Sequence, residues 1–156
     1  GRHAIRFAPD TGELGMFQGA KSYLLENPEG QTLDTYSISA GLDYASVGPE
    51  HAWLKDIGRV NYSWATDQEA MSAFKDLCEP EGIIPAIESS HAVAGAYKAA
   101  ADLKAKGYEH PVMIINISGR GDKDMNTAGK WFGYLTDEQA KALESNGAQG
   151  NNADGE

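Results

Sequence analysis

From residue 59 onward the sequence alternates short extended runs with helical patterns. Residues 59–65 are rich in β formers, and residues 83–87 and 111–117 are brief apolar runs, each followed by a helical pattern. Residues 111–117 show no polar alternation, which is typical of a strand covered on both faces. Repeated strand-then-helix order predicts parallel strands joined by crossover helices. The sequence therefore predicts an α/β fold.

Capping signals place the helices. Pro49 suits the first turn of a short helix that ends before Gly58. Thr66, with a glutamate three residues later, forms a capping box for a helix that reaches about Leu77. We expect Ser89 or Ser90 to cap the alanine-rich helix that follows.

The two ends of the chain differ from its middle. Residues 20–25 look like a strand, and the turn at 27–30 predicts a hairpin with the next extended run. A domain over residues 1–135 is expected, followed by a terminal helix at 136–144. Residues 145–156 are glycine, asparagine and acid, which predicts a disordered acidic tail.

The charge balance restricts the partners. The net charge is −10 over 156 residues, and the four arginines are scattered, which disfavours nucleic acid and anionic membrane surfaces. No apolar run approaches the ~20 residues needed to cross a bilayer. Cys78 is the only cysteine, so no internal disulfide is possible, and we expect a buried thiol in a reducing compartment. A cytoplasmic location is the simplest expectation.

Two strand-to-helix junctions carry polar residues. Ser118 and Gly119 open the turn that follows the run at 111–117, where ligands of α/β sheets collect. On the residues alone, an anion or cofactor site and a plain tight turn both stay open there. Glu88 and Ser89 follow the run at 83–87. They could be catalytic or merely helix-start residues, and a Ser-His-Asp triad is disfavoured because no Gly-x-Ser-x-Gly elbow is present.

Four short motifs, taken together and in order, resemble the tryptophan synthase β subunit family. No single motif would suffice, but the set spans about ninety residues of the sequence. The motifs are Ser37–Tyr44 (SISAGLDY), Val47–His51 (VGPEH), Gly82–Ala92 (GIIPAIESSHA) and Asn116–Asp124 (NISGRGDKD).

The resemblance implies most of the C-terminal domain of a fold-type II pyridoxal-phosphate enzyme, with a three-layer α/β/α architecture and a mostly parallel sheet. That family joins indole to L-serine to give L-tryptophan. By resemblance, Ser118 would bind the pyridine nitrogen of the cofactor, with Gly119 facing the ring and Glu88 and Ser89 beside it.

The resemblance also implies sites for the other ligands. Asp43 would engage the serine substrate. The backbone carbonyls of Tyr44 and Ser46 would bind a monovalent cation, Na⁺ or K⁺. Phe17 and Gln18 would line a tunnel that brings indole from the α subunit.

The sequence departs from that family in what it lacks. None of its nine lysines stands in the His-Lys-x-Asn context of the Schiff-base lysine, and no glycine-rich phosphate cradle is present. Both would lie before Gly1. We expect the chain alone to be inactive and to bind pyridoxal phosphate weakly or not at all. Its partners would be the N-terminal half of the β subunit, an α subunit and a second β subunit. A naturally split β subunit and a non-catalytic binding module are the alternatives.

Overall fold

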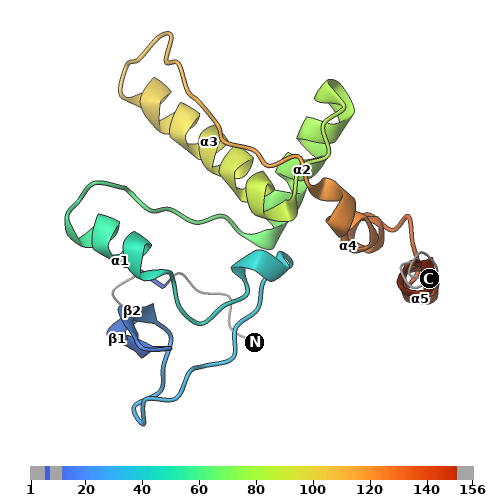
Figure 1. Ribbon diagram of the computed structural model, residues 1–156. Coiled ribbons are helices and arrows are strands. Elements are labelled where there is room, and N and C mark those ends of the chain that lie inside the picture. Colours follow the sequence, from blue (N-terminus) through green and yellow to red (C-terminus); the bar gives the residue numbers. More distant parts are fainter. Residues whose placement is uncertain (1–5, 8–11, 151–156) are drawn as a thin grey trace.

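The computed structural model describes residues 6–7 and 12–150. Figure 1 shows α2 and α3 diverging from a common base, with the hairpin and α1 grouped below them and α4 and α5 leading away to one side. The elements in chain order are β1 (Glu13–Phe17), β2 (Ala20–Leu24), the 3₁₀ turn η1 (Ala40–Leu42), α1 (Pro49–Asp56), α2 (Asp67–Glu81), α3 (Ile87–Ala105), the 3₁₀ turn η2 (Gly121–Asp124), α4 (Met125–Trp131) and α5 (Asp137–Gly150).

The N-terminal hairpin joins β1 to β2, and its turn precedes the turn at 27–30 that the sequence predicted. β1 and β2 pair antiparallel, with Phe17 opposite Ala20. The two residues between them, Gln18 and Gly19, have φ of 49° and 80°, the positive values that a tight two-residue hairpin turn requires. The turn at 27–30 also forms. It brings Glu26 opposite Thr32, and the Leu33 N–H donates to the Leu25 carbonyl at 3.0 Å. The expected hairpin is therefore confirmed only close to its turn, at residues 25–27 and 31–33, whereas β2 itself pairs with β1.

The core lies where α2 packs against α3. Small residues allow the close approach: Ala73 on α2 is buried beside Val93 and Ala94 on α3. A second group, centred on Met71 and Phe74 of α2, extends the core to Ile87 at the start of α3 and to Ala128 of α4. Cys78 packs at the edge of this second group, and burial raises the pKa of its thiol. These contacts fix the start of α3, which carries Glu88 and Ser89.

The helix-start signals of α1 and α2 are confirmed. Pro49 is the first residue of α1, and Gly58 follows that helix with φ of 67°. Thr66 accepts a hydrogen bond from the backbone of Glu69, whose carboxylate accepts the Thr66 N–H at 2.8 Å. α2 continues to Glu81, four residues beyond the expected end, and Gly82 terminates it in the left-handed conformation.

The start of α3 differs from the prediction. Ala86, rather than Ser89 or Ser90, is the residue before the first helical turn. The Ile87 N–H donates to the carboxylate of Asp124 at 2.8 Å, so the cap comes from 37 residues away. Both serines consequently lie within α3, and the Ser89 hydroxyl is available for other contacts.

The predicted parallel strands are extended but unpaired. In the part of the chain that the structure describes, β1 and β2 make up the only sheet, and residues 59–65, 83–86 and 111–117 belong to no strand. Val112 and Ile114 are 93% and 98% exposed. An extended run becomes a strand only where a neighbour offers its backbone. The chain thus combines helices with a small sheet, and the three-layer parallel architecture stays a prediction.

The C-terminal helix is longer than expected. α5 begins at Asp137 and continues to Gly150, whereas the sequence suggested an end at 144 and a disordered tail from 145. Residues 151–156 lie outside the described part. Among the described residues no helix has both the length and the apolar character to cross a membrane.

Candidate functional site

One cavity brings together residues from four separate elements. It has a volume of about 1070 Å³ and lies among the β1–β2 hairpin, the η1 loop, the start of α1 and α3. Five of the residues singled out from the sequence line it, namely Phe17, Gln18, Tyr44, Ser46 and Glu88. The other four, Asp43, Ser89, Ser118 and Gly119, are not among its lining residues.

The Glu88 carboxylate is fixed by hydrogen bonds to both of its oxygens. One oxygen accepts the Gly41 N–H at 2.9 Å, and the other accepts from the Lys123 ammonium at 2.9 Å. Partial burial acts to raise the pKa of Glu88, but the hydrogen bonds from Lys123 and from backbone N–H groups outweigh it and lower the pKa to about 2. Glu88 is therefore an anion at neutral pH and cannot act as a general acid there.

Ser89 and Ser118 form a hydroxyl pair beside Glu88. The Ser89 Oγ accepts the Ser118 backbone N–H at 3.0 Å and lies 2.8 Å from the Ser118 Oγ. When the Ser89 hydroxyl donates to Ser118, the proton of Ser118 stays free to point outward. The pair can then offer one directed O–H donor to a ring nitrogen or a carbonyl oxygen.

Two glycines let the segments of the site approach closely. A Cβ on Gly41 would lie 2.4 Å from a carboxylate oxygen of Glu88. A Cβ on Gly121 would lie 2.5 Å from the backbone oxygens of Ile84 and Pro85. Gly119 differs, because a Cβ there would meet nothing within 4 Å. The space beside Gly119 is open to a flat ligand.

β2 positions the loop that carries Tyr44 and Ser46. The Leu25 N–H donates to the Ala45 carbonyl at 2.8 Å, and the Val47 N–H donates to the Tyr23 carbonyl at 3.2 Å. The loop therefore follows β2 as an irregular third strand would, with its carbonyls at fixed places.

Arg6 binds the Tyr44 carbonyl oxygen, which the resemblance assigns to a monovalent cation. Its guanidinium donates to the Tyr44 carbonyl through Nε, at 2.7 Å, and through Nη2. Burial lowers the pKa of Arg6, and the negative charge of the exposed Asp43 acts in the opposite direction. A Na⁺ or K⁺ at the Tyr44 oxygen would have to displace this guanidinium, so the cation pair does not fit as the residues stand.

Sequence reasoning missed Lys123 and Asp124 as site residues. The Lys123 ammonium contacts Glu88 and also Asp124, at 2.8 Å. Burial lowers the pKa of Lys123, but the hydrogen bonds to Asp124 and Glu88 raise it above its usual value. A lysine held protonated in this way is a poor amine nucleophile. Both lie within the Asn116–Asp124 motif, but neither was given a role of its own.

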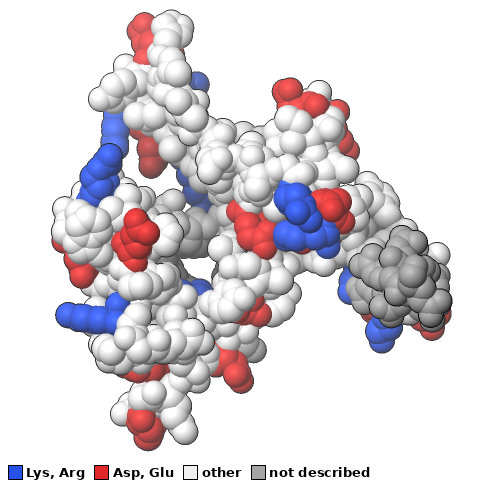
Figure 2. Space-filling model, in the orientation of Figure 1, with Lys and Arg blue, Asp and Glu red and all other residues white. Residues whose placement is uncertain are grey.

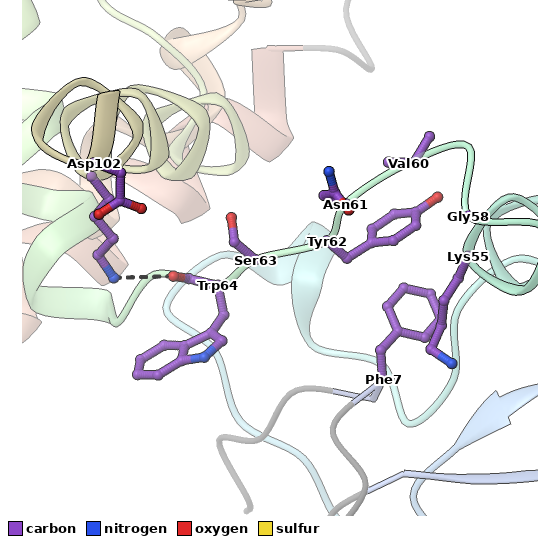
Figure 3. Close-up of a pocket in the computed structure, with 10 residues that line it drawn as sticks. Phe7, Lys55, Gly58, Val60, Asn61, Tyr62, Ser63, Trp64 and Asp102 are labelled. Carbon is purple, nitrogen blue, oxygen red and sulfur yellow. Dashed lines mark hydrogen bonds between the residues drawn. The ribbon is translucent and has the colours of Figure 1, made fainter. Parts of the chain in front are cut away.

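A second cavity lies along residues 58–64. It has a volume of about 780 Å³, and Lys55, Lys98 and Asp102 are among its lining residues. Figure 3 shows the hydrogen bond from the Lys98 ammonium to the Trp64 carbonyl, 3.1 Å long. None of the residues singled out from the sequence lines this cavity.

Comparison with known proteins shows which proteins the chain is related to. The chain is 59% identical over 135 residues to the tryptophan synthase beta chain of Mycobacterium tuberculosis (strain ATCC 25618 / H37Rv) and 57% identical over 136 residues to that of Mycobacterium leprae (strain TN). Each match covers 86% of this chain. The chain is homologous to the tryptophan synthase beta chain.

The homology concerns a C-terminal portion of the tryptophan synthase beta chain. The chain spans 31% of the length of the two mycobacterial proteins. The tryptophan synthase beta chain of Bordetella petrii (strain ATCC BAA-461 / DSM 12804 / CCUG 43448) shows the same relation, with 50% identity over 85% of this chain and 32% of its own length. No family model matches the chain.

Proposed function

We propose that this chain forms the ring-side wall of a tryptophan synthase beta active site. The complete protein would join indole to L-serine, with pyridoxal phosphate as cofactor, and release L-tryptophan. The observation that carries the proposal is the arrangement of Glu88, Ser89 and Ser118. It presents a fixed anion and a directed hydroxyl at the start of α3 and in the turn before η2 of a beta-chain homologue.

The donor set fits a pyridine ring. The free proton of Ser118 would be donated to the ring nitrogen, and the open space at Gly119 would accept the face of the ring. A neutral hydroxyl leaves the ring nitrogen unprotonated, which favours elimination over transamination. Bound pyridoxal phosphate supplies the electron sink for that chemistry. Glu88 and Ser89 hold this wall in position beside the ring.

The remaining residues would bind the substrates. The Asp43 carboxylate is exposed at the end of η1 and would accept a hydrogen bond from the hydroxyl of the serine substrate. Phe17 and Gln18 line the large cavity at the hairpin turn and would border the path of indole. The Tyr44 and Ser46 carbonyls would bind Na⁺ or K⁺ only after Arg6 moves.

The chain alone is proposed to lack activity. None of its lysines stands in the sequence context of the cofactor-holding lysine, and Lys123 is tied to two carboxylates. The N-terminal part of a beta chain would supply the missing lysine and phosphate cradle. An α subunit and a second beta chain would complete the assembly, which would be cytoplasmic.

The test is a hybrid beta chain in which this chain replaces the matching third of the Mycobacterium tuberculosis protein. We expect the hybrid, loaded with pyridoxal phosphate, to form tryptophan from serine and indole, and the 156-residue chain alone to form none. Ser118→Ala should reduce turnover on the order of 100-fold, because the ring nitrogen loses its donor. Ser145→Ala, on α5, is the matched control and should leave turnover unchanged.

Two results would contradict the proposal. An inactive hybrid that folds and assembles would remove the catalytic role and favour a binding module, which calorimetry with serine, indole and tryptophan would then detect. Tryptophan formation by the 156-residue chain alone would show that one of its own lysines holds the cofactor. Activity on mixing the chain with a separate N-terminal part would support a split beta chain.

A further inference from the structure

Lys123 lies between two carboxylates. Its ammonium is 2.9 Å from an oxygen of Glu88 and 2.8 Å from both oxygens of Asp124. Figure 2 shows acidic and basic atoms side by side over the region where α3 begins and the chain leads into α4. The Lys123 side chain is 43% exposed, whereas those of Glu88 and Asp124 are 27% and 12% exposed.

Each carboxylate is also bound to the backbone of another segment. Glu88 accepts the N–H of Gly41 in η1, and Asp124 accepts the N–H of Ile87 at the start of α3. A continuous chain of hydrogen bonds therefore runs from Gly41 through Glu88, Lys123 and Asp124 to Ile87. It connects η1, α3 and η2, the three segments that flank the residues proposed to contact the cofactor and serine.

The ammonium at the middle of this chain balances the two charges. Without the Lys123 ammonium, the carboxylates of Glu88 and Asp124 would face each other with little solvent around them. Two neighbouring negative charges disfavour ionisation of both groups. The pair would then separate or take up a proton. Either response releases Gly41 or Ile87 from its acceptor.

We propose that Lys123 is a positioning residue that fixes Glu88, and through it the η1 loop, against the Ser118 turn. What it positions rests on the proposed function, but the bracing itself does not. The charged groups that face Glu88 are Lys123 and, behind it, Asp124. His91, one turn along α3, donates through Nδ1 to the Ile87 carbonyl at 2.8 Å and borders the cavity that Glu88 lines.

Acid unfolding of the 156-residue chain tests the bracing without any cofactor. Glu88 has a pKa of about 2 in the folded chain against an ordinary value of 4.5, so it stabilises the fold above about pH 4.5, and this stability is lost as the pH falls toward 2. Lys123→Met should move this loss to higher pH by about one unit or more. Lys130→Met is the matched control, because Lys130 makes only an exposed contact with Asp137 at 3.8 Å, and it should leave the profile unchanged.

The hybrid beta chain tests what the bracing positions. Lys123→Met should lower kcat by about 10- to 100-fold and shift the pH dependence of kcat, since a displacement of about 1 Å at the ring has effects of that size. Lys123→Arg retains the charge and should recover part of the loss. The double variant Glu88→Gln/Lys123→Met should be no slower than Glu88→Gln alone, because Lys123 acts through Glu88.

Three outcomes would overturn the proposal. The first is an acid profile of Lys123→Met that matches the wild-type chain. The second is additive losses in the double variant, which would give Lys123 a role independent of Glu88. The third is a Lys123→Met hybrid with unaltered kcat and pH dependence. If the unmodified hybrid is inactive, the proposed function fails, and the acid profiles still decide whether Lys123 holds Glu88.

Discussion

Gly41 leaves no room for a side chain beside Glu88. An added Cβ would lie 2.4 Å from the Glu88 oxygen that accepts the Gly41 N–H. Gly41→Ala should therefore displace Glu88 and lower the free energy of unfolding by about 1–3 kcal/mol. The matched control is Gly95→Ala within α3, where a Cβ meets nothing within 4 Å. This change should raise the free energy of unfolding by about 0.5–1 kcal/mol. Chemical denaturation measures both, and equal effects of the two changes would contradict the close approach.

Arg6 determines whether Na⁺ or K⁺ can stabilise the folded chain. Its guanidinium already satisfies the Tyr44 carbonyl, so Na⁺ and K⁺ should not stabilise the unmodified chain more than tetramethylammonium at equal ionic strength. Arg6→Gln frees that oxygen and should create a stabilisation by K⁺ or Na⁺ of about 1.4 kcal/mol at ten times the dissociation constant. Arg59→Gln removes the same charge from an exposed position and serves as the control. Thermal unfolding in the three salts measures the effect, and a variant that responds equally to all three would refute it.

Single residues of the site were only partly predictable from the sequence. Glu88, Ser89 and Ser118 stand after apolar runs. In the structure Glu88 accepts from the Gly41 N–H, while Ser89 and Ser118 form a separate hydroxyl pair. Lys123 and Asp124 lie in the Asn116–Asp124 motif but were given no role, because their partners lie 35 and 37 residues away along the chain. Long-range partners follow from the fold, which local patterns do not specify.

At the scale of elements, the caps of α2 and α5 offer a matched comparison. Thr66 and Thr136 each exchange two hydrogen bonds with the residue three positions later. Thr66→Ala should lower the free energy of unfolding by about 1 kcal/mol, because α2 is part of the core. Thr136→Ala should leave the main transition nearly unchanged, since α5 packs mainly on α4 and can fray separately from the core. Denaturation of both variants checks this, and equal losses would show that α5 unfolds together with the core.

The same comparison shows which elements the sequence could predict. The capping box of α2 is local, and the structure contains it as expected. The start of α3 was misplaced because its N–H is capped by Asp124 from another segment. The predicted turn at 27–30 forms, but the hairpin turn at Gln18 and Gly19 was not predicted, because the sequence alone did not indicate the positive φ of Gln18. Strand pairing depends on neighbours, so the predicted parallel sheet could not be derived from the runs themselves.

At the scale of the whole molecule, apolar surface is left open along the extended runs. Val60 and Trp64 are exposed in the first run, Ile83 and Ile84 in the second, and Val112 in the third. Patches of this kind mark surfaces that another polypeptide covers. The chain spans 31% of the length of its mycobacterial relatives, so the remainder of a beta chain is the partner we expect to cover them.

Without that partner, the run at 111–117 should drive self-association. Its backbone N–H and C=O groups form no ladder among the described residues, and Val112 and Ile114 are almost fully exposed. An open apolar edge of this kind pairs with other chains, and charged residues prevent that pairing. Val112→Lys/Ile114→Lys should therefore reduce the weight-average mass in sedimentation velocity while leaving the helical circular dichroism unchanged. Leu143→Lys, on the exposed side of α5, is the control and should associate like the unmodified chain. Association that persists in the double variant would place the contact on another surface, and the run at 111–117 would then have no part in it.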